Sequence, residues 1–255
     1  MRDEEIIACC KSLKLSRNLA DMAQTMEGDS HQEYLYQLLA AELKNREQGR
    51  ATKLINSAGF YNIKTFEGFR FDEITLPGNL TQEDLKSLKF IREKKNIIMY
   101  GRTGTGKTML STALGVAACR KGISVRFYRT AALVNQLSEA KKAGILGVLL
   151  KKLNKASVII LDEFGYVPYD RTGAQLLFDY LCEIHEQKSV ILNTNLEFSR
   201  WVNVLYDEQM TAALIGRLMH HCYLLLFPGE NNRLRESSIH ELYGSIAPTA
   251  RKEDN

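Results

Sequence analysis

The sequence predicts an α/β fold in which a parallel sheet with flanking helices follows a small all-helical N-terminal domain. Two patterns predict it. Residues 3–57 contain no proline, and their apolar residues recur at steps of three and four, as in amphipathic helices. Beyond residue 95, short apolar segments alternate with helical patterns. Such alternation is typical of a parallel sheet with helices on both faces.

The N-terminal part is expected to form two helical segments. Between them, Gly28 is a candidate C-cap, and Asp29 or Ser30 is a candidate N-cap. The helical pattern breaks over residues 60–79, where aromatic residues, two glycines and a proline gather. The sequence therefore predicts three regions, which are a helical domain at 1–66, an α/β domain at 67–246 and a disordered tail at 247–255.

The α/β domain is expected to contain five strands and several helices. The strands are predicted over residues 96–100, 124–128, 157–161, 189–193 and 222–227. Helices are predicted between the first four strands, over residues 108–121, 131–155 (in one piece or two) and 173–187.

A glycine-rich turn, GRTGTGKT, follows the strand predicted at 96–100 and precedes a predicted helix. It fits the pattern G-x-x-x-x-G-K-[ST], in which glycines let successive N–H groups surround phosphate oxygens. The helix start adds its free N–H groups, Lys107 reaches the β- and γ-phosphates, and the Thr108 hydroxyl is a candidate Mg²⁺ ligand. The predicted ATP-binding residues are Gly101, Thr103, Gly104, Thr105, Gly106, Lys107, Thr108 and Met109.

Two acidic residues come directly after the apolar strand predicted at 157–161. Ligands of open α/β sheets bind at the carboxyl ends of strands. We therefore expect Asp162 to hold Mg²⁺ and Glu163 to activate the attacking water as a catalytic base. An apolar run followed by two acids is often only a strand end. Here it lies 55 residues after Lys107, one strand–helix unit further along, which strengthens the prediction.

The fourth predicted strand ends in the residues Asn-Thr-Asn. A polar side chain there is suited to orienting the water that attacks a γ-phosphate. The candidates are Thr194 and Asn195, with Asn193 as the rival, and a turn without a catalytic role is the alternative. Arg217 lies in an apolar helical segment. It is either a surface cation or an arginine finger that reaches the γ-phosphate bound by a neighbouring subunit.

The net charge is only +4, which permits a nucleic-acid partner without requiring one. Clustered basic residues are candidates for sequence-independent contacts to DNA phosphates, and a solvated helix face is the alternative for each of them. They are Lys44, Arg46, Arg50 and Lys53 in the N-terminal part, and Lys141, Lys142, Lys151 and Lys152 in the α/β domain.

Other features argue against metal centres, secretion and membrane insertion. The five cysteines include no C-x-x-C pair, so no cysteine metal site is expected. His220 and His221 are expected to have no acidic or cysteine neighbour and receive no metal or catalytic role. The acidic N-terminus does not resemble a signal peptide, and no apolar run reaches the length that spans a bilayer. A cytoplasmic protein without a membrane partner is expected.

The chain resembles the IstB-like AAA+ ATPases, which are helper proteins of one class of bacterial insertion-sequence transposons. These proteins are related to the DnaC and DnaI helicase loaders. The resemblance covers nearly the whole chain, and its most family-specific segments span residues 162–168 and 194–201. The segments that carry it, in order, are GRTGTGKTMLSTALGVAACRKG, AALVNQL, VIILDEFGYVPYDRTGAQLLFDY, NTNLEFSRW and AALIGRLMHHC.

This resemblance implies a P-loop AAA+ core that assembles into rings or spirals on duplex DNA. It assigns Lys107 and Thr108 to Walker A, Asp162 and Glu163 to Walker B, Asn195 to sensor I and Arg217 to the arginine finger. Relatives commonly have Asp before the finger arginine, where this chain has Gly216. Arg233 and Arg235 are the positions considered for a sensor II residue, and neither is assigned.

The resemblance further implies an ATP- and Mg²⁺-dependent regulator of transposition. Such a protein oligomerises on duplex DNA, recruits the cognate transposase and hydrolyses ATP in order to disassemble. Two alternatives are kept: a replicative helicase loader of the DnaC or DnaI kind, and a nucleotide-dependent DNA adaptor that does not hydrolyse ATP.

Overall fold

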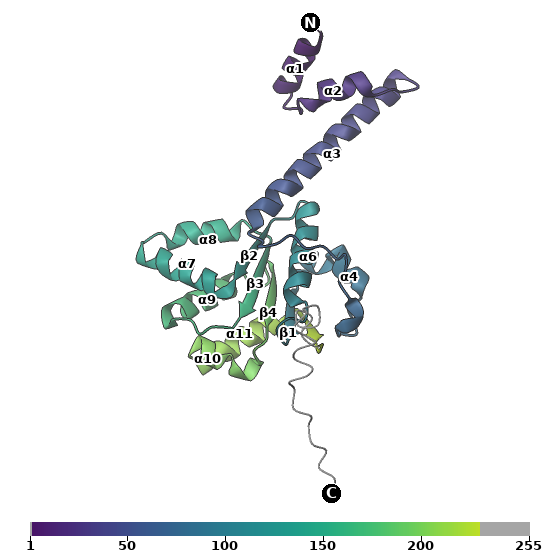
Figure 1. Ribbon diagram of the computed structural model, residues 1–255. Coiled ribbons are helices and arrows are strands. Elements are labelled where there is room, and N and C mark those ends of the chain that lie inside the picture. The colour runs from purple at the N-terminus through teal and green to yellow at the C-terminus, as the bar shows by residue number, and fades with distance from the viewer. Residues whose placement is uncertain (1, 230–255) are drawn as a thin grey trace, which may run out of the picture.

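A five-stranded parallel sheet forms the centre of the protein (Figure 1). The structure is a computed structural model, and it describes residues 2–229. The strands lie in the order β2-β3-β4-β1-β5, and all neighbouring pairs run parallel. Their bounds are β1 Asn96–Gly101, β2 Val125–Arg129, β3 Val158–Phe164, β4 Ser189–Thr194 and β5 Cys222–Phe227.

All five predicted strands are present, and most of their bounds lie within one residue of the prediction. The exception is β3, which was expected to end at Leu161 and continues to Phe164. A bulge lies between Leu161 and Phe164, and Phe164 pairs with Thr194 of β4 beyond it. The sequence pattern missed this extension because the two acids at 162 and 163 interrupt the apolar run.

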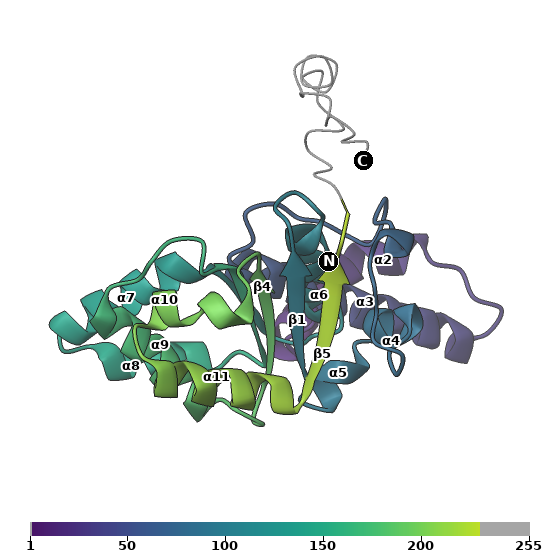
Figure 2. The same cartoon turned by 90° about the horizontal axis from the view of Figure 1, so that it is seen from below.

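Helices cover both faces of the sheet (Figure 2). One face packs against α7–α11, which span residues 130–220, and this layer includes the fully buried side chains of Leu137, Leu177 and Trp201. The other face packs against α4–α6, which span residues 82–120, and against the end of α3 (His31–Ala58), where Leu85 and Leu114 are fully buried. Burial on both faces explains why the central strands β1, β3 and β4 are almost uninterrupted apolar runs.

The helices of the α/β part follow the predicted alternation. The region predicted at 131–155 forms two helices. The helix predicted at 173–187 ends four residues early, because Glu186 takes a left-handed backbone conformation in the turn that follows. The bounds are α4 Gln82–Ser87, α5 Lys89–Arg92, α6 Lys107–Arg120, α7 Thr130–Lys142, α8 Leu146–Asn154, α9 Arg171–Glu183, α10 Val202–Leu205 and α11 Glu208–His220, with 3-10 turns at Phe71–Glu73 and Phe198–Arg200.

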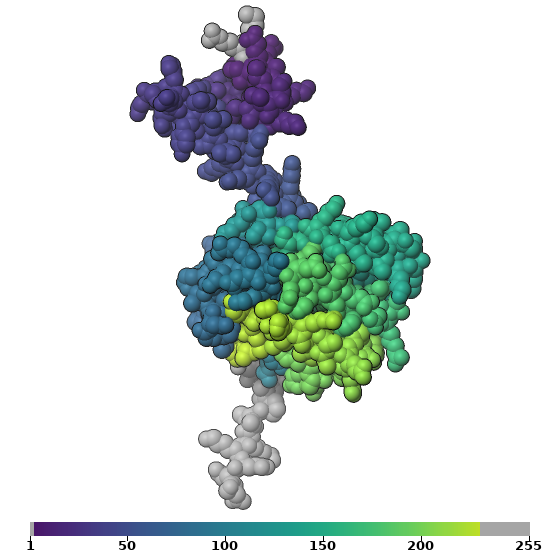
Figure 3. Space-filling model, turned by 180° about the vertical axis from the view of Figure 1, so that it is seen from behind, coloured from purple at the N-terminus to yellow at the C-terminus, as the bar shows by residue number. Residues whose placement is uncertain are grey.

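Three helices form the N-terminal part, α1 Arg2–Ser12, α2 Asn18–Thr25 and α3 His31–Ala58. The Ser30 side chain caps α3 by accepting a hydrogen bond from the Glu33 N–H, and Gly59 ends it in a left-handed conformation with φ of 87°. The 28 residues of α3 reach from the α1–α2 unit to the sheet. Figure 3 shows the N-terminal residues as a lobe joined to the larger part by a narrower neck.

The last turns of α3 belong to the core beneath the sheet. Ala58 is buried there, and Leu54 and Ile55 pack against the same hydrophobic cluster. The division of the chain at residues 66 and 67 stays a prediction. The packing ties the N-terminal lobe to the α/β part through a continuous helix.

The predicted tail at 247–255 and the residues Arg233 and Arg235 lie outside the described residues. Within residues 2–229, no helix combines the length and the apolar character that crossing a bilayer requires.

Candidate nucleotide-binding site

A cavity of about 500 Å³ opens at the carboxyl ends of β1, β3 and β4. Seven of the eight predicted ATP-binding residues form it, from Thr103 and Gly104 through Lys107 to Met109. Gly101 is not among the lining residues. Asp162, Glu163 and Asn195 line the same cavity. The topology thus brings together residues that were selected from three separate strand ends.

The loop between β1 and α6 depends on its glycines. Gly101 has a φ of 157°, and a Cβ atom there would lie 2.3 Å from the carbonyl oxygen of Phe227 on β5. Gly106 has a φ of 98°, which L side chains rarely adopt, and it directly precedes α6. The loop can therefore turn sharply between strand and helix, and the N-terminus of α6 faces the cavity.

Lys107 lies on the first turn of α6 with its ammonium group directed back along the loop. Its Nζ donates hydrogen bonds to the carbonyl oxygens of Gly101, at 2.7 Å, and Arg102, at 2.5 Å. The side chain is buried, so the charge is held at the base of the cavity by the loop that surrounds it. An ammonium group in this position is suited to binding phosphate oxygens.

Thr108, Asp162 and Asn193 form a hydrogen-bonded group that joins α6, β3 and β4. The Thr108 hydroxyl donates to Asp162 Oδ2 at 3.0 Å, and Asn193 Nδ2 donates to Asp162 Oδ1 at 2.9 Å. Asn193 Nδ2 also lies 2.8 Å from the Ser111 hydroxyl. Asp162 is only 5% exposed, so two neutral donors hold a buried carboxylate.

The possible metal ligands here are both oxygen donors. They are the Thr108 hydroxyl and the Asp162 carboxylate, which are hydrogen-bonded to each other. Mg²⁺ prefers such oxygen ligands, and in nucleotide sites it is bound by one or two protein groups together with phosphates. A buried carboxylate also gains from a nearby cation. Thr108 and Asp162 therefore fit a magnesium ion.

Asn193 is the residue of this group that the sequence prediction placed second to Asn195. Asn193 lies beside Asp162 because Leu161 of β3 pairs with Leu192 of β4, directly before the bulge, and the side chains of the two residues that follow are hydrogen-bonded. This alignment is the signal that favours Asn193 as the partner of the carboxylate. It requires the strand register, which the sequence pattern alone does not provide.

Glu163 projects toward the mouth of the cavity from the bulge of β3. Its backbone φ is 57°, an uncommon conformation for a residue other than glycine. Its carboxylate lies 3.4 Å from Arg129 Nε, at the end of β2. The Arg129 guanidinium in turn lies over the Tyr61 ring, 4.5 Å from the centroid. Arg129 and Tyr61 were not predicted as site residues, since no spacing pattern relates them to Glu163.

Asn195 occupies the rim of the cavity. Its Nδ2 lies 3.5 Å from the Thr103 hydroxyl of the loop. Further lining residues come from the segment before β1, including Tyr61, Phe69 and Glu73. Phe69 packs edge-on against Phe71, with ring centroids 4.8 Å apart, so this segment forms an apolar wall beside the phosphate loop.

Arg217 is not among the residues that line this cavity. It is exposed on α11, its guanidinium is hydrogen-bonded to the Cys182 sulfur, and it lies 5.9 Å from the centroid of the Phe178 ring. Arg217 therefore contacts α9 and does not line the nucleotide cavity of its own chain. An arginine finger at this position would act on the site of another subunit.

The candidate DNA-contacting residues differ in their surroundings. Arg46 forms an ion pair with the buried Glu42 at 2.7 Å and donates to the carbonyl oxygen of Lys14. Arg50 donates to the carbonyl oxygen of Gly122 at 3.1 Å. These two arginines therefore hold the N-terminal lobe together and join α3 to the α/β part. The other candidates, which are exposed like these two arginines, are Lys44 and Lys53 on α3, Lys141 and Lys142 on α7, and Lys151 and Lys152 on α8.

One expectation about the histidines is wrong. His220 and His221 were expected to have no acidic neighbour, but Glu186 Oε1 lies 3.4 Å from a ring nitrogen of each. The fold brings the turn after α9 beside the end of α11, and sequence spacing does not show this proximity.

The parallel sheet, the loop around Lys107 and the Thr108–Asp162 pair define a P-loop nucleotide-binding protein of the AAA+ class. The family model of the IstB-like ATP binding proteins matches residues 11–240, and the chain belongs to this family. The predicted recognition and fold class are thereby confirmed.

Curated relatives include two proteins that are named for ATP binding in insertion sequences. The one from IS21 of Pseudomonas aeruginosa is 35% identical over 209 residues, which are 81% of this chain and 78% of the relative. The one from IS5376 of Geobacillus stearothermophilus is 32% identical over 223 residues, 88% of both chains.

Solved structures with the same fold include DnaI and DnaA. DnaI matches with a TM-score of 0.52 and 17% identity, over 71% of this chain and 93% of DnaI. AMPPCP-bound DnaA from Aquifex aeolicus matches with a TM-score of 0.54 and 21% identity, over 76% of this chain and 58% of DnaA. At these identities the likeness establishes the fold.

Proposed function

We propose that this protein is an ATP-dependent DNA-binding regulator of transposition. ATP would join adjacent subunits on duplex target DNA, the assembly would recruit the transposase, and hydrolysis would release the subunits. The family and the insertion-sequence relatives support the transposition context. The observation that carries the ATPase function is the Thr108–Asp162 contact at the base of the cavity, with Glu163 at its mouth.

In this proposal, backbone N–H groups of the loop and the Lys107 ammonium bind the phosphates. Bound Mg²⁺ would neutralise phosphate charge and orient the γ-phosphate. Thr108 and Asp162 would hold the ion. Glu163 would accept the proton of the attacking water, and Asn195 at the rim would orient that water. Since Glu163 is nearly half exposed, water can reach its carboxylate.

The second half of the proposed site comes from a neighbouring subunit. Arg217 is exposed and remote from its own cavity. In a ring or spiral, α11 of one subunit would present this guanidinium to the γ-phosphate that another subunit binds. The ATP molecule would then stabilise the interface until it is hydrolysed, because both subunits contact the same phosphates.

The test compares the ATPase rate with and without duplex DNA, for the wild-type protein and for Glu163→Gln. We expect duplex DNA to stimulate wild-type hydrolysis. Glu163→Gln should lower kcat by about 10²–10⁴-fold, because it removes the general base. It should retain ATP-dependent assembly on duplex DNA. Lys107→Ala is the control that should lose ATP binding and assembly together.

Three results would count against this function. One is a wild-type protein that hydrolyses no ATP, and another is an ATPase rate that duplex DNA leaves unchanged. The third is binding to a replicative helicase in place of the transposase of the same insertion sequence, which would favour a helicase loader. If Glu163→Gln still released DNA in the presence of ATP, release would not require hydrolysis, and this result would favour the non-hydrolysing adaptor.

A further inference from the structure

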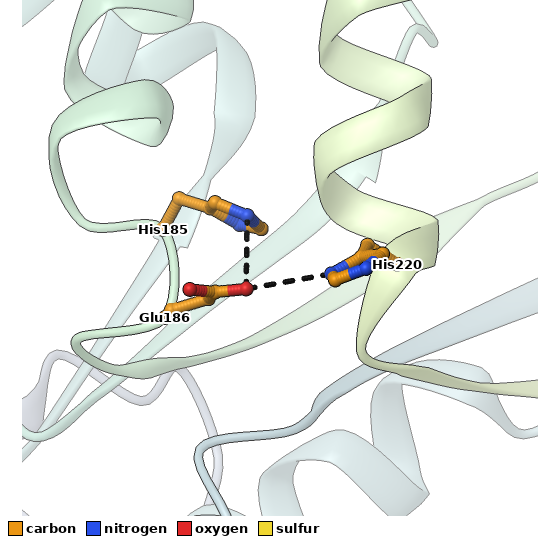
Figure 4. A group of neighbouring side chains, drawn as sticks. All are labelled: His185, Glu186 and His220. Atoms are coloured by element: carbon orange, nitrogen blue, oxygen red, sulfur yellow. Dashed lines mark ion pairs between the residues drawn. The ribbon is translucent and has the colours of Figure 1, made fainter.

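A second group of side chains that can bind a metal lies at the amino ends of strands β4 and β5, whereas the nucleotide cavity lies at the carboxyl ends of the strands. His185 and Glu186 follow α9 in the turn before β4, and His220 is the last residue of α11. Figure 4 shows the two imidazoles and the carboxylate directed toward one another. One ligand atom from each of the three side chains can be chosen so that all lie within 4.8 Å of one another.

The distances at the centre of this group are longer than hydrogen bonds. Glu186 Oε1 lies 3.6 Å from His185 Nε2, 3.4 Å from His220 Nδ1 and 3.4 Å from His221 Nε2. An N–H···O hydrogen bond typically measures about 2.7–3.2 Å. Ligand atoms around a tetrahedral Zn²⁺ ion, with bonds of about 2.0–2.2 Å, are separated by roughly 3.3–3.6 Å. The spacing between the Glu186 oxygen and each imidazole nitrogen therefore suits neighbouring ligands of one ion.

We propose that His185, Glu186 and His220 bind a divalent transition-metal ion, with Zn²⁺ as the ion whose chemistry fits this set. Two imidazole nitrogens and one carboxylate oxygen are ligands that Zn²⁺ commonly accepts, whereas Mg²⁺ and Ca²⁺ prefer oxygen ligands alone. The fourth position is taken by His221 or by water. This site is separate from the Thr108–Asp162 pair in both its position and its ligand chemistry.

The backbone around the group is held in place by Asn96 at the start of β1. Its side-chain amide donates to the carbonyl oxygen of Leu218, near the end of α11, and its Oδ1 accepts from the Val190 N–H of β4. Its backbone N–H donates to the carbonyl oxygen of His221. One buried asparagine thus fixes the distance between the two segments that supply the ligands.

Two of the three side chains are exposed and can rotate toward an ion. His220 is 65% exposed and Glu186 is 53% exposed, so both can rotate, while His185 is 23% exposed and held more firmly. The ligand atoms of His185 and His220, which lie within 4.8 Å of one another, need to approach by up to about 1 Å to reach the separation of a tetrahedral site. A bound ion would cross-link the α9–β4 turn to the end of α11.

The proposal is tested by titrating Zn²⁺ into the full chain by isothermal calorimetry. The protein is prepared without a histidine tag, treated with a chelator and measured without nucleotide. We expect about one equivalent of Zn²⁺ to bind. Glu186→Gln and His220→Ala should each weaken that binding by at least about tenfold, since each removes one ligand. His31→Ala, which alters an exposed histidine on α3, is the matched control and should leave it unchanged.

Cobalt(II) provides a second readout, because visible absorption bands distinguish tetrahedral from octahedral coordination. Wild-type protein should give tetrahedral bands that Glu186→Gln lacks. Circular dichroism and ATP binding show whether each variant is folded, and the near-isosteric Glu186→Gln keeps the test valid if His220→Ala is unstable. Absence of stoichiometric Zn²⁺ binding, or binding that survives both Glu186→Gln and His185→Ala, overturns the proposal. Because no nucleotide is present, this outcome is independent of the ATPase test.

Discussion

Asp162 and Asn193 show how single residues shape the nucleotide site. A buried carboxylate is costly unless its oxygen atoms accept hydrogen bonds, and here Thr108 and Asn193 donate to it. Asn193 is fully buried, whereas Asn195 is exposed at the rim. The two asparagines lie two residues apart at the end of the same strand and should therefore respond differently to substitution.

Asn193→Ala is expected to destabilise the protein by about 1–3 kcal/mol, because it removes a buried hydrogen bond to a charged group. Asn195→Ala should change the free energy of unfolding by less than about 0.5 kcal/mol. Its main effect should be a lower kcat, since Asn195 is the proposed water-orienting residue. Urea unfolding with linear extrapolation, together with ATPase rates, separates the two effects. Equal destabilisation by the two substitutions would contradict this assignment.

At the scale of elements, α3 depends on a buried acid near the α1–α2 unit. Glu42 is 3% exposed and accepts hydrogen bonds from the Ser16 N–H and the Arg46 guanidinium. Burial raises the pKa of Glu42, but the hydrogen bonds from Ser16 and Arg46 outweigh it and hold the pKa below its ordinary value of 4.5. The ionised carboxylate therefore stabilises the folded N-terminal lobe.

A carboxyl group whose pKa is lower in the folded state than in the unfolded state stabilises the fold when it is ionised. This contribution is fully present above the unfolded-state pKa and is lost as the pH falls through the folded-state pKa. The contribution of Glu42 should be complete above about pH 5 and decline below pH 4.5. Glu42→Gln should be less stable than wild type near pH 7 and should show a smaller further loss on acidification. Helix content followed during urea unfolding at several pH values measures both. Identical pH profiles for the two proteins would exclude this role.

The elements of the α/β part were predictable because parallel strands buried on both faces are continuous apolar runs. The ends of the strands were less predictable where polar residues take part in strand pairing. Asp162 and Glu163 ended the apolar run, although β3 continues through them to Phe164. Pairs such as Arg129 with Glu163, and Glu186 with His220, depend on which strand ends and turns meet in space. The spacing of residues in the sequence does not show which of these side chains lie close together.

At the scale of the whole molecule, the residues proposed to contact duplex DNA lie on two surfaces, one on α3 and one at the ends of α7 and α8. All four basic candidates on α3 are exposed, but Arg46 and Arg50 contact Glu42 and Gly122 within the protein, so we select Lys44 and Lys53 for the test. Phosphate contacts act independently of sequence and are weakened by salt.

The double substitution Lys44→Glu/Lys53→Glu is therefore expected to weaken binding to unrelated duplex sequences by similar factors. It should also reduce the dependence of binding on salt concentration, because two phosphate contacts are lost. Arg92→Glu/Lys94→Glu makes the same change in charge at exposed positions before β1 and should have a smaller effect. Fluorescence anisotropy over a range of salt concentrations provides the comparison. An equal loss in both variants would show that only net charge matters.

The central claim is that each ATP site is completed by a neighbouring subunit. The most direct measurement mixes Lys107→Ala chains, which keep Arg217, with Arg217→Ala chains, which keep the nucleotide site. Each variant alone should have almost no ATPase activity on duplex DNA. A Lys107→Ala chain should not assemble alone, but its Arg217 can still contact the ATP that an Arg217→Ala chain binds; if all pairings in the mixture were equally frequent, about one interface in four would join an intact nucleotide site to an intact Arg217. We predict recovery of up to about a quarter of the wild-type rate; a mixture no more active than the separate variants would contradict the claim.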